Sequence, residues 1–178
     1  MSDYDKVREE YKPAHIKVLM IAESQPPAAG VASSRQFYRT DSIYREDRLF
    51  TNTIRALYPE AVDVAEATLK QDKEKWLQRF KKDGWYMTEA LETSLEHEVT
   101  KEQRQELIRD ALPRLIERVK KLAGPYTRII LIKSNVFAVA AEPLRNAGFT
   151  VLNHELLDYP GRFNQKAYRE KLARLTAR

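Results

Sequence analysis

The feature that most constrains this fold is a short apolar segment, residues 16–22, that ends abruptly at a carboxylate. Its centre, Val18-Leu19-Met20-Ile21, does not alternate with polar residues, which is typical of a strand covered on both faces in a parallel sheet. Glu23 follows, and two prolines after it restrict the backbone. Ligands of open parallel sheets bind beyond the carboxyl ends of the strands, so we expect Glu23 at the edge of an active site.

Three more segments have the composition of strands, and helical patterns separate them. The strands are expected at 85–91, 128–133 and 149–152, although Glu-Ala-Leu in the first of these also favours a helix. Strands separated by helices imply right-handed crossovers and a parallel sheet. We therefore predict a three-layer α/β/α fold with a short central parallel sheet of about four strands. The expected helices lie at 47–58, 72–83, 100–123, 136–147 and from 165 onward.

Two of the expected helices contain a proline. Pro113 and Pro143 are each expected to kink or divide the helix that holds them, because proline lacks the N–H of the helical hydrogen bond.

The chain is expected to form one domain. Its 178 residues fit a single unit at 16–178, preceded by a charged leader at 1–15 with a short helix near its middle. The sequence has no cysteine and no apolar run of membrane-spanning length, and its first residues are acidic and polar. We expect a monomeric cytoplasmic protein without disulfides.

The net charge of +5 and the pI near 9.3 favour polyanionic partners. We expect DNA or a nucleotide as the ligand and no membrane contact, although moderately basic proteins without a nucleic-acid role are common.

A long loop at 23–46 carries cations interleaved with aromatic residues, among them Arg35, Phe37, Tyr38 and Arg39. Such a mixture can hold a phosphate and stack a base, and it can equally be a loop anchored by aromatic residues in the core. Three residues elsewhere are further candidate phosphate contacts, namely Lys133 at the end of the third strand and Arg162 and Asn164 near a helix start. The alternative interpretation of Lys133 is a side chain that is simply exposed to solvent.

Other common sites are not indicated. His15, His97 and His154 lack metal-ligand spacing, and without cysteine no zinc-thiolate or iron–sulfur centre can form. The glycines are scattered, which argues against a phosphate-binding glycine-rich loop. We expect no metal and no cofactor.

Several motifs together resemble the uracil-DNA glycosylase superfamily over roughly residues 16–165. The run Ala22-Glu23-Ser24-Gln25-Pro26 is similar to the strand-end motif that carries the catalytic acid of that family. The resemblance implies that Phe37, with Tyr38 beside it, stacks on the extruded base and that Glu89 reads its edge. The last motif of the family is similar to Tyr159-Pro160-Gly161-Arg162.

The departures from the family pattern concern the chemistry. Tyr159 stands in place of a histidine that stabilises the departing base, and its neutral hydroxyl can still donate a hydrogen bond. Glu89 stands in place of an asparagine, and a carboxylate that only accepts hydrogen bonds favours a base with an amino group over uracil. The cysteines of the thermostable branch are absent.

These observations leave three functional hypotheses. The first is an enzyme that hydrolyses the N-glycosidic bond of a damaged or deaminated base in DNA, with Glu23 acting on water or sugar and Tyr159 on the base. The second is a protein of the same fold that binds nucleic acid or a nucleotide without turnover, and the third is a flavodoxin-like protein that binds a small anion. For Glu23 itself, the alternative to catalysis is capping of the following turn.

Overall fold

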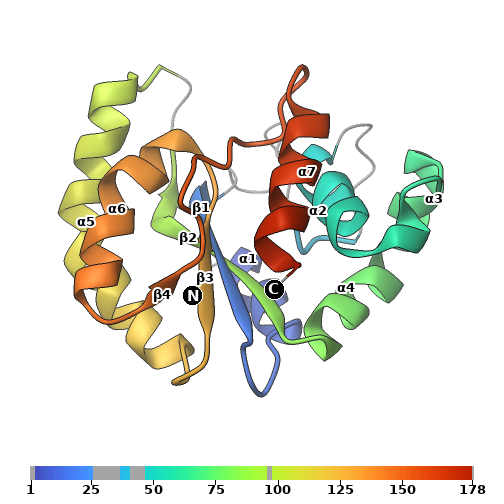
Figure 1. The fold of residues 1–178 in the computed structure, drawn as a ribbon, viewed down its shortest axis with the longest axis horizontal. Helices are drawn as coiled ribbons and strands as arrows, with labels where there is room; N and C mark the ends of the chain where they lie inside the picture. Colours follow the sequence, from blue (N-terminus) through green and yellow to red (C-terminus); the bar gives the residue numbers. More distant parts are fainter. Residues whose placement is uncertain (1–2, 26–36, 41–46, 96–97, 178) are drawn as a thin grey trace.

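The centre of the protein is a sheet of four parallel strands in the order β2-β1-β3-β4 (Figure 1). The structure is a computed structural model that describes residues 3–25, 37–40, 47–95 and 98–177. The predicted short parallel sheet of about four strands is confirmed. The strands are β1 (Val18–Gln25), β2 (Trp85–Ser94), β3 (Arg128–Leu131) and β4 (Thr150–Val151).

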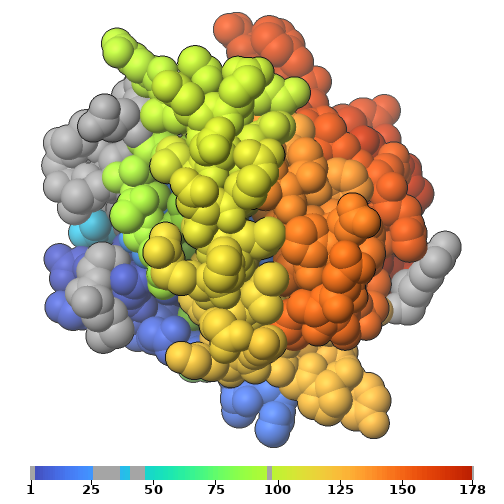
Figure 2. Space-filling model, turned by 90° about the vertical axis from the view of Figure 1, so that its left-hand side faces the viewer, coloured from blue at the N-terminus to red at the C-terminus, as the bar shows by residue number. Residues whose placement is uncertain are grey.

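Helices cover both faces of this sheet, so the predicted three-layer α/β/α fold is confirmed as well. The helices α5 and α6 lie on one side, and α2, α3, α4 and α7 lie on the other (Figure 1). Seen from the first side, α5 and α6 pack next to each other (Figure 2). The helices are α1 (Asp3–Glu10), α2 (Arg48–Leu57), α3 (Glu66–Gln71), α4 (Lys73–Lys82), α5 (Lys101–Leu122), α6 (Ser134–Asn146) and α7 (Gln165–Thr176), with a 3₁₀ turn at Pro59–Ala61.

The connections create a switch point between β1 and β3. From β1 the chain leads to α2 on one side of the sheet, and from β3 it enters α6 on the other side. In parallel sheets a crevice opens where neighbouring strands send their connections to opposite faces. The carboxyl ends of β1 and β3 therefore mark the place where a ligand site is expected.

The apolar strand runs are buried on both faces, as their lack of alternation predicts. Leu19 and Met20 of β1 and Ile129 and Ile130 of β3 are fully inaccessible to solvent. The sheet thus forms a core that both helical layers share.

Some boundaries differ from the sequence predictions. β1 continues to Gln25 because β2 also runs on and pairs with its end, so Glu23 lies within the strand. The segment 85–91 is a strand, and the helical alternative is wrong. The helices α5 and α6 continue through Pro113 and Pro143. Pro113 is exposed, so water can bond the carbonyl that lacks a helical N–H partner.

The N-terminal segment, expected as a charged leader, packs against the domain. In α1 the side chains of Tyr4 and Arg8 are buried, and both bond to Glu89 of β2. No helix in the described part of the chain combines the length and the apolar surface that crossing a bilayer requires.

Candidate functional site

Glu23 lies at the switch point because β1 is longer than its neighbour β3. The last residue of β1 paired with β3 is Ile21, opposite Leu131, and β1 then continues to Gln25. Beyond that pair, the turn into α6 takes the place of a neighbouring strand. Glu23 thus has β2 on one side and the start of α6 on the other.

Three side chains fix the carboxylate of Glu23, and the four residues together are here called the Glu23 cluster. Asn135 Nδ2 donates to Glu23 Oε1 at 2.8 Å, and Arg104 donates to Oε2 at 3.0 Å. Lys133 Nζ donates to the same Oε2. Both oxygens of Glu23 are therefore occupied by donors from α6, from α5 and from the turn that follows β3.

The donors are themselves held in place. Gln105 donates to Asn135 Oδ1 at 3.4 Å, which orients the amide so that its nitrogen faces Glu23. Arg104 donates through Nε to the carbonyl of Val99 at 3.0 Å. Asn135 and Arg104 are thus each fixed by a second hydrogen bond besides the one to Glu23.

Lys133 has an unusual backbone conformation. Its φ is +83°, and among the described residues it is the non-glycine residue with a positive φ. Its N–H donates to the carbonyl of Leu157 at 2.7 Å, and its carbonyl accepts from Phe137 N at 3.1 Å. Such strain costs about 1–3 kcal/mol and is concentrated at functional sites. Here it accompanies the contact of Lys133 with Glu23.

The charges favour an ionised Glu23 and leave the cluster positive. Burial raises the pKa of the Glu23 carboxyl, but hydrogen bonds from Lys133 and Asn135 and the charges of Lys133 and Arg104 outweigh this effect and lower the pKa below its usual range. The side chain of Glu23 is 4% exposed, whereas those of Lys133 and Arg104 are 35% and 21% exposed. A ligand would therefore meet the two cations first.

Lys133 is the predicted phosphate contact that the structure brings to Glu23. Arg104 and Asn135 were missed as site residues, because Arg104 reads as one charge among many on a helix and Asn135 as a helix cap. The sequence does contain one signal for Asn135, which is its position directly after a strand that neighbours β1.

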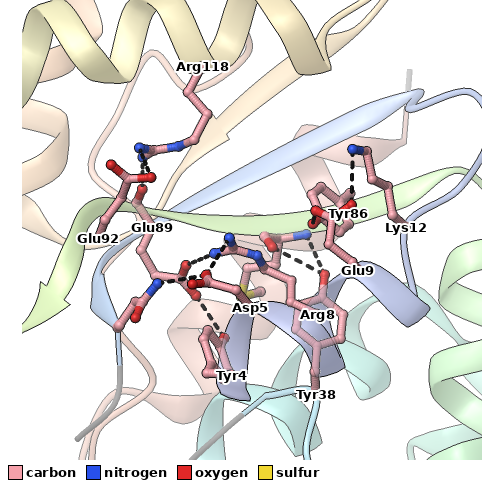
Figure 3. Close-up of polar contacts among 12 residues, drawn as sticks. Tyr4, Asp5, Arg8, Glu9, Lys12, Tyr38, Tyr86, Glu89, Glu92 and Arg118 are labelled. Carbon is pink, nitrogen blue, oxygen red and sulfur yellow. Dashed lines mark hydrogen bonds and ion pairs between the residues drawn. The ribbon is translucent and has the colours of Figure 1, made fainter. Parts of the chain in front are cut away.

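Glu89 lies on the opposite face of the sheet from Glu23. It pairs with Ala22, and successive residues of a strand point to opposite faces. Tyr4 Oη donates to Glu89 Oε1 at 2.7 Å, Arg8 donates to Oε2 at 2.5 Å, and Arg8 also bonds Asp5 at 2.8 Å (Figure 3). Tyr4, Asp5, Arg8 and Glu89 are here called the Glu89 cluster.

The predicted role of Glu89 as base reader is therefore wrong for this structure. Glu89 is 3% exposed and both of its oxygens are occupied by α1, so no ligand edge can reach it. Burial raises the pKa of Glu89, and the charge of Arg8 and the hydrogen bonds from Tyr4 and Arg8 only partly oppose this shift.

Phe37 and Tyr38 are core residues, which corrects their prediction as a stacking platform. Phe37 is 2% exposed and packs edge-on against Tyr38 and Phe50, at ring-centroid distances of 5.1 and 5.9 Å. The Tyr38 hydroxyl accepts from the Met87 N–H at 2.6 Å, so it satisfies the backbone at the outer edge of β2. Of the two sequence interpretations, aromatic anchoring in the core holds.

The segment 157–164 adjoins the cluster through the contact between Leu157 and Lys133. Tyr159 is half-buried, and its carbonyl accepts from Asn164 Nδ2 at 2.8 Å. The side-chain amide of Asn164, a predicted phosphate contact, thus shapes this turn. Arg162 is exposed, with its guanidinium 5.6 Å from the ring centre of Phe163, which is 95% exposed.

Arg39 and Arg35 are the two remaining predicted phosphate contacts. Arg39 is half-buried, and Arg35 lies outside the described residues. Within the described ranges, no group of three or more histidine, cysteine, aspartate or glutamate residues is arranged to hold a metal ion.

The comparisons with known proteins give no assignment. No protein-family model matches the sequence, and neither a curated protein nor a solved structure is significantly similar to it. The case for a function therefore rests on the Glu23 cluster.

Proposed function

We propose that this protein hydrolyses the N-glycosidic bond of a damaged or deaminated base in DNA, with Glu23 as the central carboxylate. The observation that carries the proposal is a buried carboxylate with a lowered pKa, placed at the switch point beneath two partly exposed cations. The similarity of residues 22–26 to the acid-bearing motif of uracil-DNA glycosylases supports it.

The proposed reaction fits an ionised Glu23. Water attacks the C1′ carbon, the C1′–N bond breaks, and the base leaves with the electron pair of that bond. A carboxylate can stabilise the positive charge that develops on the sugar, or accept the proton of the attacking water. Because the pKa of Glu23 is lowered, the group suits these roles and not that of a general acid.

The proton or hydrogen bond for the leaving base must then come from another group. We assign this role to the hydroxyl of Tyr159, as the family resemblance implies, because its segment adjoins Lys133 through Leu157. We assign contacts with the DNA phosphates to Lys133, Arg104 and the exposed Arg162, which all carry positive charge.

A second candidate is a protein that binds nucleic acid or a nucleotide at the same switch point without turnover. Two observations favour it. The oxygens of Glu23 already accept hydrogen bonds from three side chains, and Phe37, Tyr38 and Glu89 lie in the core, away from any base.

A base-release screen separates the two candidates. Single-stranded and duplex oligonucleotides, each with one deaminated or alkylated base, are incubated with the protein, and free base is measured by mass spectrometry. We expect release by the wild type and its loss in Glu23→Gln, with no loss in the control Glu117→Gln, whose carboxylate lies on exposed α5 surface.

The other outcomes decide between the candidates. Binding that weakens with salt but releases no base contradicts the hydrolase and supports the binding protein. Absence of DNA binding even at low salt contradicts both.

A further inference from the structure

We propose that Lys133 is a nucleophile that forms a Schiff base with an aldehyde, the ring-opened deoxyribose of an abasic site in DNA. This inference rests on the proposed action on DNA, because an abasic site is what base excision leaves behind. It adds to hydrolysis a covalent step with an amine of this chain.

The geometry of Lys133 favours a reactive amine over a surface charge. Its backbone is held at a φ of +83° by hydrogen bonds on both its N–H and its carbonyl. An ordinary surface ion pair does not require such a conformation, since exposed pairs contribute little to stability. About a third of the side chain is exposed, so Lys133 is accessible from solvent.

The amine of Lys133 lies directly beside a carboxylate. Lys133 Nζ and Arg104 both bond to Oε2 of Glu23, so two cations share one carboxylate oxygen. A guanidinium does not act as a nucleophile in proteins, so Lys133 is the member of this pair that can attack a carbonyl carbon. Glu23 Oε2 lies in contact with Lys133 Nζ, so this carboxylate can take up a proton from the amine as the C–N bond forms.

The chemistry needs no oxidant, reductant or further reactant. The Nζ lone pair attacks the C1′ aldehyde carbon, the carbonyl oxygen takes up protons and leaves as water, and a C1′=N bond remains. Loss of a C2′ proton then forms the C2′=C3′ bond and breaks the C3′–O bond, so the phosphate leaves with the electron pair. Water finally hydrolyses the imine and returns the lysine.

Borohydride trapping tests this proposal without any need for base excision by the protein. An oligonucleotide with an abasic site made beforehand by a separate enzyme is mixed with the protein, and sodium borohydride reduces any imine to a stable amine bond. We expect a covalent protein–DNA adduct in the wild type. Peptide mass spectrometry should place it on Lys133.

The matched variants separate a nucleophile from a structural cation. Lys133→Arg keeps the charge beside Glu23 but has no amine, so the adduct should fall by at least about tenfold. Lys120→Arg changes an exposed lysine of α5 and should form the wild-type amount of adduct. Thermal unfolding of both variants shows whether they remain folded.

Each outcome of the trapping experiment either supports or overturns the role of Lys133. No adduct, or an adduct that maps to the N-terminus or to another lysine, overturns the role of Lys133, and this mapping needs no variant. An adduct on Lys133 without any base release would overturn the proposed hydrolase and leave the covalent chemistry standing.

Discussion

Glu23 and Glu89 are two buried carboxylates on neighbouring strands, and their surroundings differ in one decisive respect. Each accepts a hydrogen bond from an arginine, and the side chain of each is 4% exposed. The arginine bonded to Glu89 is largely buried, since 10% of the Arg8 side chain is exposed. The two cations bonded to Glu23 are more accessible, with 21% of the Arg104 side chain and 35% of the Lys133 side chain exposed. Glu89 is thus held by a buried partner, whereas the partners of Glu23 are partly accessible to solvent.

The pKa shifts of the two carboxylates follow this difference. Burial dominates at Glu89 and raises its pKa, whereas at Glu23 the donors outweigh burial and lower it. Burial of a carboxylate is therefore a poor sign of a functional site by itself. Access to the groups that hold the carboxylate is the better sign.

The largest loss of stability should come from the Glu89 cluster. Glu89→Gln leaves the guanidinium of Arg8 buried without its main counter-charge, and breaking a buried pair costs about 3–5 kcal/mol. Urea unfolding measures the change. Glu92→Gln, which removes an exposed carboxylate of the same strand, should cost less than about 1 kcal/mol. Equal losses in the two variants would refute the comparison.

Removing both partners of that pair should restore much of the stability. Buried ion pairs can be replaced by apolar side chains of similar volume at little net cost. The double variant Arg8→Met, Glu89→Leu should therefore be about 2 kcal/mol more stable than Glu89→Gln in the same urea titration. A double variant less stable than Glu89→Gln would mean that the charges themselves hold α1 in place.

A smaller loss with a distinct pH dependence is expected at Glu23. Glu23→Gln should cost about 1.5–3 kcal/mol at pH 7, the usual value for hydrogen bonds to a charged group. Because the folded pKa of Glu23 is lowered, its contribution exists above the unfolded value of about 4.3 and is lost as pH falls through the folded pKa. The gap between wild type and Glu23→Gln should therefore close in acid.

Glu89 should show the opposite pH dependence. Its folded pKa is raised, so its contribution is present below the unfolded value and is lost as pH rises through the folded pKa. Unfolding experiments at several pH values on Glu23→Gln and Glu89→Gln compare the two directly. Parallel pH profiles would show that the two sites do not differ electrostatically.

The smallest expected effect concerns the backbone strain at Lys133. Lys133→Gly and Lys133→Ala both remove the amine, but only glycine is relaxed at a φ of +83°. The glycine variant should be more stable by about 1 kcal/mol in chemical denaturation. Equal stability would mean that the strained turn costs nothing and carries no argument for function.

Much of the fold followed from local patterns. The apolar run at 18–21 and the run at 129–131 predicted strands buried on both faces, and the strand–helix alternation predicted the parallel sheet. Boundaries at the site were less predictable, because the length of β1 depends on how far β2 extends beside it. No local signal of residues 16–25 contains that information.

The position of the site was predictable from the sequence, but only some of its residues were. Glu23 and Lys133 were found because both follow apolar strands of a parallel sheet. The contact of Arg104 with Glu23 spans 81 residues, and the contact of Arg8 with Glu89 spans the same distance. Such pairings depend on tertiary packing, which also explains why Glu89 and Phe37 were assigned to a ligand site although both are buried in the core.

We propose that Glu23 acts on a substrate and does more than complete an ion-pair cluster. The most direct test is the single-turnover rate of base release from the best substrate, compared between wild type, Glu23→Gln and Glu117→Gln at equal folded fraction. We predict a loss of about 10²-fold or more in Glu23→Gln alone, as expected for a group that acts in the transition state. A rate in Glu23→Gln equal to that of the wild type would contradict the account.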